Sequence, residues 1–276
     1  MHNHDIKLIA IDLDGTLFNS HKKVTTANQN ALAKARQKGV KVVITTGRPL
    51  KAIGNLLEEL NLVSDEDYCI TFNGGLVQKT TGDILDKSAL SYQDLETIYA
   101  HLEPLGLPFD VLSDGIVYSL PSKGNHSLYP TANPMLTFVA LERFEDIPRD
   151  VTYNKVVTVT EAAFLDQQLT KLEAEIFEQY EAFKSRDIIF EIMPKGVHKA
   201  SGLAQLCQHL AYDSNQVMAI GDEENDISMI EWAGLGVAMA NATDKVKQIA
   251  DQVTTKTNEA SGVAEAIEKY VLSEED

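Results

Sequence analysis

The chain has few basic residues and few cysteines for its length. Its 276 residues include 24 Lys and Arg against 41 Asp and Glu, which gives a formal net charge of −17. Nucleic acids and anionic membranes bind basic faces, so we expect neither of them as a main partner. The two cysteines, Cys69 and Cys207, stand in apolar stretches and are predicted to be reduced core residues.

The sequence also lacks long hydrophobic runs and two common phosphate-binding motifs. No apolar stretch approaches the length needed to cross a bilayer, and the opening residues MHNHDIK have no secretory pattern, so we expect a cytoplasmic protein. Neither the GxxxxGK[ST] loop of kinase-type sites nor the GxGxxG turn of dinucleotide sites occurs. A phosphate site would therefore need a different construction.

The first and last thirds of the chain contain alternating strand and helix patterns. Short apolar runs at 7–11, 40–45 and 68–71 each end in polar residues or glycine, and helical patterns at 25–39 and 49–61 lie between them. The same alternation returns after residue 194. This rhythm predicts an α/β fold, a Rossmann-like parallel sheet with covering helices, interrupted by an insertion.

The middle of the chain has a different pattern. Residues 109–121 predict a hairpin around Asp114-Gly115, further strands are expected at 154–160 and 187–193, and residues 164–180 read as one long amphipathic helix. Hairpins combined with a few helices indicate an α+β unit with an antiparallel sheet. We therefore predict two domains, a core of residues 1–82 and 194–276 and an inserted domain of residues 83–193.

Acidic residues follow two of the predicted core strands. Asp12 and Asp14 come after the first strand and point to the same face, because residues i and i+2 of a strand do so. A second group, in GDEEND at 221–226, follows a late strand. If the two strand ends are neighbours, their carboxylates could all be ionised only with a cation present. Carboxylate oxygens are ligands that suit Mg²⁺.

Two further segments offer groups for an anion. The stretch TTGR at 45–48 places hydroxyls, a glycine and backbone N–H groups beside a predicted helix start, which suits phosphate oxygens. Lys199 opens a predicted helix, where a positive charge is unfavourable for the helix dipole, and this hints at another role. Carboxylates, a divalent cation and a lysine together predict phosphoryl transfer.

These segments resemble, in order, the four motifs of the haloacid dehalogenase superfamily. The matching stretches are DLDGT at 12–16, TTGR at 45–48, Lys199, and GDEEND at 221–226. The position and size of the insertion resemble the class IIB cap of the Cof-like phosphatases. The resemblance covers essentially the whole chain and implies a catalytic core with a cap that determines substrate specificity.

The resemblance also implies roles for individual residues. Asp12 corresponds to the nucleophile and a metal ligand, and Asp14 to the general acid/base, whose backbone carbonyl also binds the metal. Asp222 corresponds to the principal distant metal ligand, with Glu223 and Asp226 binding the metal directly or through water. The implied phosphate-binding residues are Leu13, Thr46, Gly47, Lys199 and Asn225. Thr45 is the less favoured hydroxyl, and Lys195 is the alternative to Lys199.

The expected activity is Mg²⁺-dependent hydrolysis of small phosphate monoesters through an aspartyl phosphate, with sugar phosphates as the substrate class that the resemblance favours. Two alternatives share the same residues. A phosphomutase would use the same chemistry but return the phosphoryl group to the product. A phosphosugar sensor would bind without turnover, although it would have no use for both Asp12 and Asp14. The expected partner is a small phosphorylated metabolite, and the sequence identifies no protein partner.

Overall fold

A computed structural model describes residues 5–273 of the chain. Contacts divide the chain into two compact units. Among the described residues, the first unit comprises 5–47, Asn55–Asp86 and 198–273, and the second comprises Arg48–Gly54 and Lys87–Val197.

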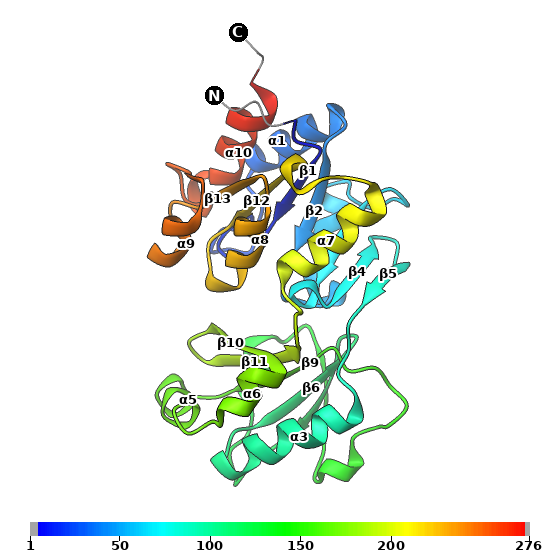
Figure 1. The fold of residues 1–276 in the computed structure, drawn as a ribbon, viewed down its shortest axis with the longest axis vertical. Helices are drawn as coiled ribbons and strands as arrows, with labels where there is room; N and C mark the ends of the chain where they lie inside the picture. The colour runs from blue at the N-terminus through cyan, green and yellow to red at the C-terminus, as the bar shows by residue number, and fades with distance from the viewer. Residues whose placement is uncertain (1–4, 274–276) are drawn as a thin grey trace. The chain divides into compact units, whose positions relative to one another are not determined.

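The first unit is built on an eight-stranded sheet with the order β14-β13-β12-β1-β2-β3-β4-β5. The pairs from β14 to β3 are parallel, and β3 pairs antiparallel with β4. The strands span Leu8–Ile11 (β1), Lys41–Thr45 (β2), Tyr68–Thr71 (β3), Leu76–Lys79 (β4), Ile84–Lys87 (β5), Val217–Gly221 (β12), Leu235–Ala238 (β13) and Gln252–Val253 (β14). The predicted parallel sheet, shared by the first and last thirds of the chain, is therefore confirmed (Figure 1).

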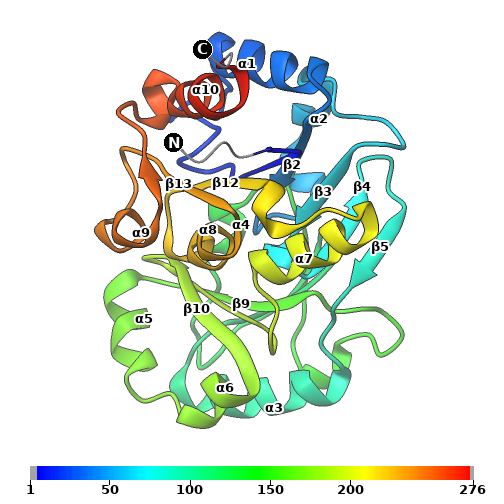
Figure 2. The same ribbon diagram turned by 45° about the horizontal axis from the view of Figure 1, so that its top comes forward.

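Helices cover both faces of this sheet. The helices span Thr26–Gln37 (α1), Leu56–Glu59 (α2), Lys199–Leu210 (α7), Ile227–Trp232 (α8), Asp244–Ile249 (α9) and Gly262–Ile267 (α10). The β1-α1-β2 and β12-α8-β13 crossovers run in opposite directions along the sheet, so right-handed connections place α1 and α8 on opposite faces. Figure 2 shows α1 beside α10, and α7 beside α8.

The helix predicted at 49–61 is wrong as a continuous element. The chain forms a 3₁₀ turn at Leu50–Ile53, leaves the helix at Gly54, and resumes as the short helix α2. Gly54 has a φ of 68°, a left-handed value that a helix interior does not tolerate. The apolar spacing was correct, but the glycine inside it interrupts the helix.

The second unit contains a six-stranded sheet with the order β10-β11-β9-β6-β7-β8. Its pairs are antiparallel except for β7 with β8, which is parallel. The strands span Phe109–Ser113 (β6), Ile116–Leu120 (β7), Thr137–Ala140 (β8), Lys155–Val159 (β9), Tyr180–Arg186 (β10) and Ile189–Pro194 (β11). The predicted α+β character is confirmed, as is the hairpin, in which Asp114 and Gly115 have φ of 47° and 88°, as a type I′ turn requires.

Helices pack on one face of this second sheet. They span Tyr92–Leu102 (α3), Ala162–Leu169 (α5) and Ala174–Gln179 (α6), while the short α4 covers Tyr129–Ala132. Buried residues of α3, α5 and α6 join Phe109 and Val111 of β6 in one hydrophobic core. The single long helix predicted at 164–180 is wrong, because the chain breaks between α5 and α6 and its last residue already begins β10.

Two further expectations concern cysteines and membrane spans. Cys69 and Cys207 are both free and buried, as predicted. Within residues 5–273, no helix combines the length and the apolar character that a bilayer crossing demands.

Candidate active site

The site forms where two neighbouring strands of the first unit end side by side. β1 and β12 are paired in parallel, with Ile11 opposite Ile220. From these strands the chain crosses in opposite directions, to β2 on one side and to β13 on the other. Such a reversal of strand order leaves a crevice at the carboxyl ends of the strands, where ligands bind in open α/β sheets. Asp12 and Asp222 follow β1 and β12 directly at this point.

Lys199 lies among the carboxylates and is completely buried. Its Nζ is 2.5 Å from Oδ1 of Asp12 and 2.5 Å from Oδ1 of Asp226. This arrangement explains a lysine at the first position of α7, because the two carboxylates outweigh the unfavourable helix dipole. Lys195 lies elsewhere, in the second unit, where it is exposed and pairs with Glu181.

Close backbone contacts fix the start of α7, and with it the position of Lys199. A Cβ added to Gly74 would lie 2.1 Å from the carbonyl oxygen of His198, and one added to Gly202 would lie 2.9 Å from Cα of Gly74. His198 caps the helix, with its Nδ1 accepting the Ser201 N–H at 3.1 Å. The turn after β3 and the first turn of α7 are therefore in direct backbone contact.

Asp226 organises the loop after β12. Its Oδ2 accepts the backbone N–H groups of Asp222 at 2.9 Å and Glu223 at 3.1 Å, while its Oδ1 faces Lys199. These contacts occupy both oxygens, so Asp226 positions Asp222 and Lys199, and its predicted role as a metal ligand stays a prediction. Glu223 is exposed and stands outside the group of carboxylates whose oxygens lie within 4.8 Å of one another, namely Asp12, Asp222 and Asp226.

The turn after Asp12 is shaped to admit the side chain of Asp222. A Cβ on Gly15 would lie 2.2 Å from Oδ2 of Asp222, so only glycine leaves room for this carboxylate. Thr16 donates its hydroxyl to Oδ1 of Asp222 at 2.6 Å, and Asn241 donates to the carbonyl of Gly15 at 2.8 Å. The two acidic strand ends are therefore fixed to each other by direct contacts.

Burial and like charges give the carboxylates unusual proton affinities. Burial raises the pKa of Asp12 to about 7, although the charge of Lys199 opposes the shift. Burial, followed by the charge of Asp12, raises the pKa of Asp222 to about 8. Burial acts to lower the pKa of Lys199, but the charges of Asp12 and Asp226 hold it above its ordinary value, so Lys199 stays protonated. Three carboxylates around one ammonium leave an excess of negative charge, and this donor set fits a hard divalent cation.

Asp14 has a different environment from Asp12. Its side chain is 24% exposed and forms an ion pair with Lys22. Lys22 was not identified from the sequence, because it lies in an irregular loop with a φ of 57° and no periodic spacing relates it to Asp14. A partly exposed carboxylate beside the buried pair of Asp12 and Asp222 suits a group that exchanges protons.

Apart from Lys199 at the start of α7, the groups expected to bind phosphate follow three strands, with Leu13 after β1. Thr46 and Gly47 follow β2, and Asn225 lies in the loop after β12. The amide of Asn225 donates to Oδ1 of Asn73 at 3.2 Å, and Asn73 in turn donates its backbone N–H to the Thr46 carbonyl at 3.0 Å. Asn73 thus connects the predicted residues. It was not predicted as a site residue, because a contact between separate strand ends leaves no local spacing in the sequence.

Two side chains limit what their residues can offer a ligand. The Leu13 side chain is fully buried, so Leu13 could contact a phosphate only through its backbone. The Thr45 hydroxyl is buried, and within the described part of the chain it has no hydrogen-bond partner. A Cβ on Gly47 would lie 2.9 Å from Oδ1 of Asn73, so this position accepts no side chain without displacing Asn73.

The second unit contains its own buried charges, on the sheet face opposite α3, α5 and α6. Nζ of Lys155 is 2.6 Å from Oε2 of Glu191, and Ser185 donates to Oε1 of the same carboxylate at 2.7 Å. Asp110 is fully buried and accepts hydrogen bonds from Ser119 at 2.5 Å and from Ser127. Burial raises the pKa of Asp110 to about 6.

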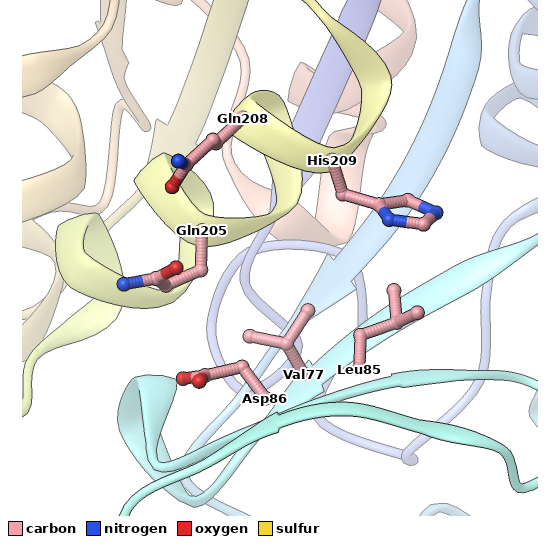
Figure 3. Close-up of a pocket in the computed structure, with 6 residues that line it drawn as sticks. All are labelled: Val77, Leu85, Asp86, Gln205, Gln208 and His209. Carbon is pink, nitrogen blue, oxygen red and sulfur yellow. The ribbon is translucent and has the colours of Figure 1, made fainter.

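A separate hollow of about 210 Å³ lies between α7 and the strands β4 and β5. Figure 3 shows side chains of α7 facing side chains of the two strands; the lining residues are Val77, Leu85, Asp86, Gln205, Gln208 and His209. None of these six is a lysine or an arginine, and the phosphate-binding residues predicted from the sequence are not among them. We assign this hollow no part in the chemistry.

Comparison with known proteins identifies the family of the chain. Residues 9–267 match the family of haloacid dehalogenase-like hydrolases. A Bacillus subtilis protein that carries the name of a phosphatase, YxeH, is 37% identical over 270 residues, which cover 97% of this chain and 99% of YxeH. The 5-amino-6-(5-phospho-D-ribitylamino)uracil phosphatase YcsE of the same organism is 33% identical over 274 residues, 97% of each chain.

Solved structures agree in fold as well as in sequence. The structure of a haloacid dehalogenase-like hydrolase from Bacteroides thetaiotaomicron has a TM-score of 0.81 at 30% identity, covering 96% of this chain and 99% of that one. The sugar phosphatase BT4131, described as a member of subclass IIB, has a TM-score of 0.81 at 25% identity, covering 97% and 100%. The chain therefore belongs to the haloacid dehalogenase-like hydrolases, as a Cof-like phosphatase with the subclass IIB architecture.

Proposed function

We propose that the protein hydrolyses phosphate monoesters of small metabolites, with sugar phosphates as its main substrate class, in a Mg²⁺-dependent reaction through an aspartyl phosphate. The observation that carries the proposal is the buried contact of Lys199 with Asp12. A phosphoryl group at the Asp12 carboxylate would lie beside this ammonium, which would neutralise the charge of its oxygens. Phosphoryl transfer depends mostly on such positioning and charge neutralisation.

In the first step Asp12 is the nucleophile. One carboxylate oxygen of Asp12 forms a bond to phosphorus while the bond from phosphorus to the ester oxygen breaks. Asp14 donates its proton to the leaving oxygen, so the product leaves as a neutral alcohol. The partly exposed setting of Asp14 supports this role, because a group that gives up a proton must later recover one.

In the second step water cleaves the aspartyl phosphate, which is a mixed anhydride. Asp14, now ionised, accepts a proton from the water as its oxygen bonds to phosphorus. The bond between phosphorus and Asp12 then breaks, and inorganic phosphate leaves. Asp12 returns as a carboxylate, and Asp14 is again protonated, so the cycle closes without another reactant.

The remaining residues would hold the phosphoryl group in place. Lys199 would neutralise the charge of the phosphoryl group. Its oxygens would be bound by Thr46, Gly47, Asn225 and the backbone of Leu13. Mg²⁺ would be held by the carboxylates of Asp12 and Asp222 and the backbone carbonyl of Asp14, with Glu223 and Asp226 contributing directly or through water. When bound, the ion would neutralise the excess negative charge and polarise the phosphoryl oxygens.

The substrate class rests on two named relatives and on the second unit. BT4131 is described as a sugar phosphatase, and YcsE is named for a substrate with a phosphorylated ribityl chain. Both descriptions involve a phosphate ester on a polyhydroxylated carbon chain, which supports the same class here. We assign the core chemistry to the first unit and the choice of substrate to the second.

The test is phosphate release from a panel of sugar phosphates and other phosphorylated metabolites in Mg²⁺, comparing the native protein with Asp12→Asn. We expect release by the native protein only, with a loss of at least about 10³-fold in the variant, which keeps the shape of Asp12 but removes the nucleophile. An active Asp12→Asn variant would overturn the nucleophile assignment. Isomer conversion without release would instead identify a mutase, and calorimetric binding without either would identify a sensor.

A further inference from the structure

The two sheets differ in how their edge strands are protected from pairing with another chain. Unpaired N–H and C=O groups along an edge strand are a template for another strand, and proteins usually block them with charge, short length or bulges. Within residues 5–273, the sheets end in four edge strands, namely β5, β14, β8 and β10.

Three of these edges carry such protection. β5 ends in the charged pair Asp86-Lys87, and β14 is only two residues long. β10 carries Glu181, Lys184 and Arg186, with an irregularity in its pairing between the last two. Each of these features discourages the approach of a further strand.

The fourth edge strand, β8, is four residues long, as β5 is, but it has neither charge nor a bulge. Its sequence, Thr137-Phe-Val-Ala140, contains no charge, no proline and no glycine, and its pairing with β7 is regular. Thr137, Val139 and Ala140 are exposed. β-Branched and aromatic residues such as Thr137, Phe138 and Val139 are the types enriched in strands, so the composition of β8 is compatible with a further pairing.

The direction of the backbone N–H and C=O groups determines which residues of β8 could pair with a further strand. Thr137 donates its N–H to the Gly115 carbonyl at 3.1 Å, and Leu141 donates to Ser119 at 2.9 Å, so the odd-numbered positions face β7. Successive residues of a strand point their backbone groups to opposite edges. The N–H and C=O groups of Phe138 and Ala140 therefore point away from the sheet.

We propose that β8 is an interaction surface for a second copy of this chain, which pairs antiparallel with it and extends the sheet through a two-fold axis at Val139. In this register Phe138 of each copy exchanges both backbone hydrogen bonds with Ala140 of the other, as an antiparallel pair requires. The two Val139 side chains meet at the axis, where β-branched neighbours stabilise the pairing.

The flanking residues are compatible with this register. Glu142 would lie opposite Leu136 of the second copy, and Arg143 opposite Met135, so no like charges are opposed. Met135 is 55% exposed and Val139 37%, and the pairing would cover both. A two-fold axis makes the contact self-complementary and closed, so it yields a dimer and no longer chain of copies.

The first measurement is the mass of the native protein by light scattering or sedimentation across a range of concentrations. The short strand predicts a dimer whose fraction grows with concentration. A native protein that stays monomeric up to the highest concentration at which it is soluble would overturn the proposal.

Two variants locate the contact. Ala140→Pro removes an outward N–H that β7 does not use, and Ala140→Lys adds a charge to the edge, so both should be monomeric. Ile84→Lys, which adds the same charge to the exposed edge of β5, is the matched control and should dimerise like the native protein. Dimers of both Ala140 variants would refute the assignment to β8.

Amide exchange gives an independent readout that does not depend on whether Ala140→Pro folds. In the native protein, the amides of Phe138 and Ala140 should exchange more slowly as the concentration rises. The amide of Val139, which faces β7, should be protected at all concentrations. Equal exchange of Phe138 and Ala140 at low and high concentration, in a protein that does dimerise, would place the contact elsewhere.

Discussion

Each unit of this protein buries a lysine against carboxylates, and the two arrangements differ in their charge balance. Lys199 in the first unit is within 2.5 Å of two carboxylates, and Asp222 adds a third to the same group. Lys155 in the second unit pairs with Glu191, whose other oxygen accepts a hydroxyl from Ser185. The first cluster has surplus negative charge, whereas the contact described in the second joins one lysine to one carboxylate.

This difference separates a reactive site from a structural one. Surplus charge in a buried site is costly, and it persists where a cation or a reacting group will compensate for it. A matched and hydrogen-bonded pair calls for no such group, and its removal should affect the fold alone. Variants of the two lysines test whether this distinction holds.

Lys199→Ala should have the largest effect. Loss of the ammonium leaves Asp12 and Asp226 buried without their counter-charge, which should lower the free energy of unfolding by about 3–5 kcal/mol. Phosphate release should fall by about 10²-fold or more, because the charge on the phosphoryl group is no longer neutralised. Urea unfolding followed by the fluorescence of Trp232, the single tryptophan, reports on the first unit.

Lys195→Ala is the matched control for this variant. Its side chain is 54% exposed and its ion pair with Glu181 spans 3.5 Å, so its removal should change the free energy of unfolding by less than about 1 kcal/mol. If Lys199→Ala behaved like Lys195→Ala in both assays, the role of Lys199 would be refuted.

Lys155→Met should destabilise the second unit without acting on the chemistry of the first. Breaking the pair leaves Glu191 buried and should cost about 3–5 kcal/mol of unfolding free energy. The double variant Lys155→Met with Glu191→Leu should recover most of this loss, because an apolar pair replaces both charges. Circular dichroism follows the unfolding of both units. A double variant that is no more stable than the single one would contradict a purely structural role for the pair of Lys155 and Glu191.

Asp110→Asn should change the pH dependence of stability. The native pKa of Asp110, about 6, exceeds the ordinary value of 3.8, so the folded state binds the extra proton between these values and stability falls as pH rises through this window. The shift corresponds to about 3 kcal/mol. We expect the difference in unfolding free energy between native protein and variant to fall by this amount from pH 4 to pH 7, and a constant difference would contradict it.

Added Mg²⁺ should increase the thermal stability of the protein, and this should be the smallest of the four predicted effects. Binding at 100 times the dissociation constant stabilises a folded protein by about 2.7 kcal/mol. The melting temperature should rise with added Mg²⁺ and fall again with EDTA, and Asp222→Asn should abolish the shift. Equal shifts in the native protein and the variant would move the metal away from Asp222.

Much of the fold could be predicted from the sequence, because buried parallel strands are short apolar runs with clear ends. The strands at 7–11 and 40–45, and the type I′ turn at Asp114-Gly115, follow from local composition alone. The predicted helices at 49–61 and 164–180 were wrong as continuous elements. In the first of them, the apolar spacing continues across Gly54, whose left-handed backbone interrupts the helix.

The site was predictable to the extent that its residues stand at strand ends. Asp12, Asp222 and Lys199 are brought together because β1 and β12 are neighbours and α7 starts beside them. The supporting contacts of Thr16, Asn73 and Lys22 could not be found from the sequence. Thr16 reaches a carboxylate 206 residues away, and no local spacing encodes such a contact.

The glycines around the carboxylates determine how this site can evolve. A Cβ at Gly15 would lie 2.2 Å from Oδ2 of Asp222, and one at Gly221 would lie 2.5 Å from the side chain of Asp226. Even a methyl group is excluded at both positions, because the carboxylates of Asp222 and Asp226 occupy the space that a Cβ would take. A library of random variants should therefore show almost no tolerance at Gly15 and Gly221, while new substrate preferences would have to arise at other positions.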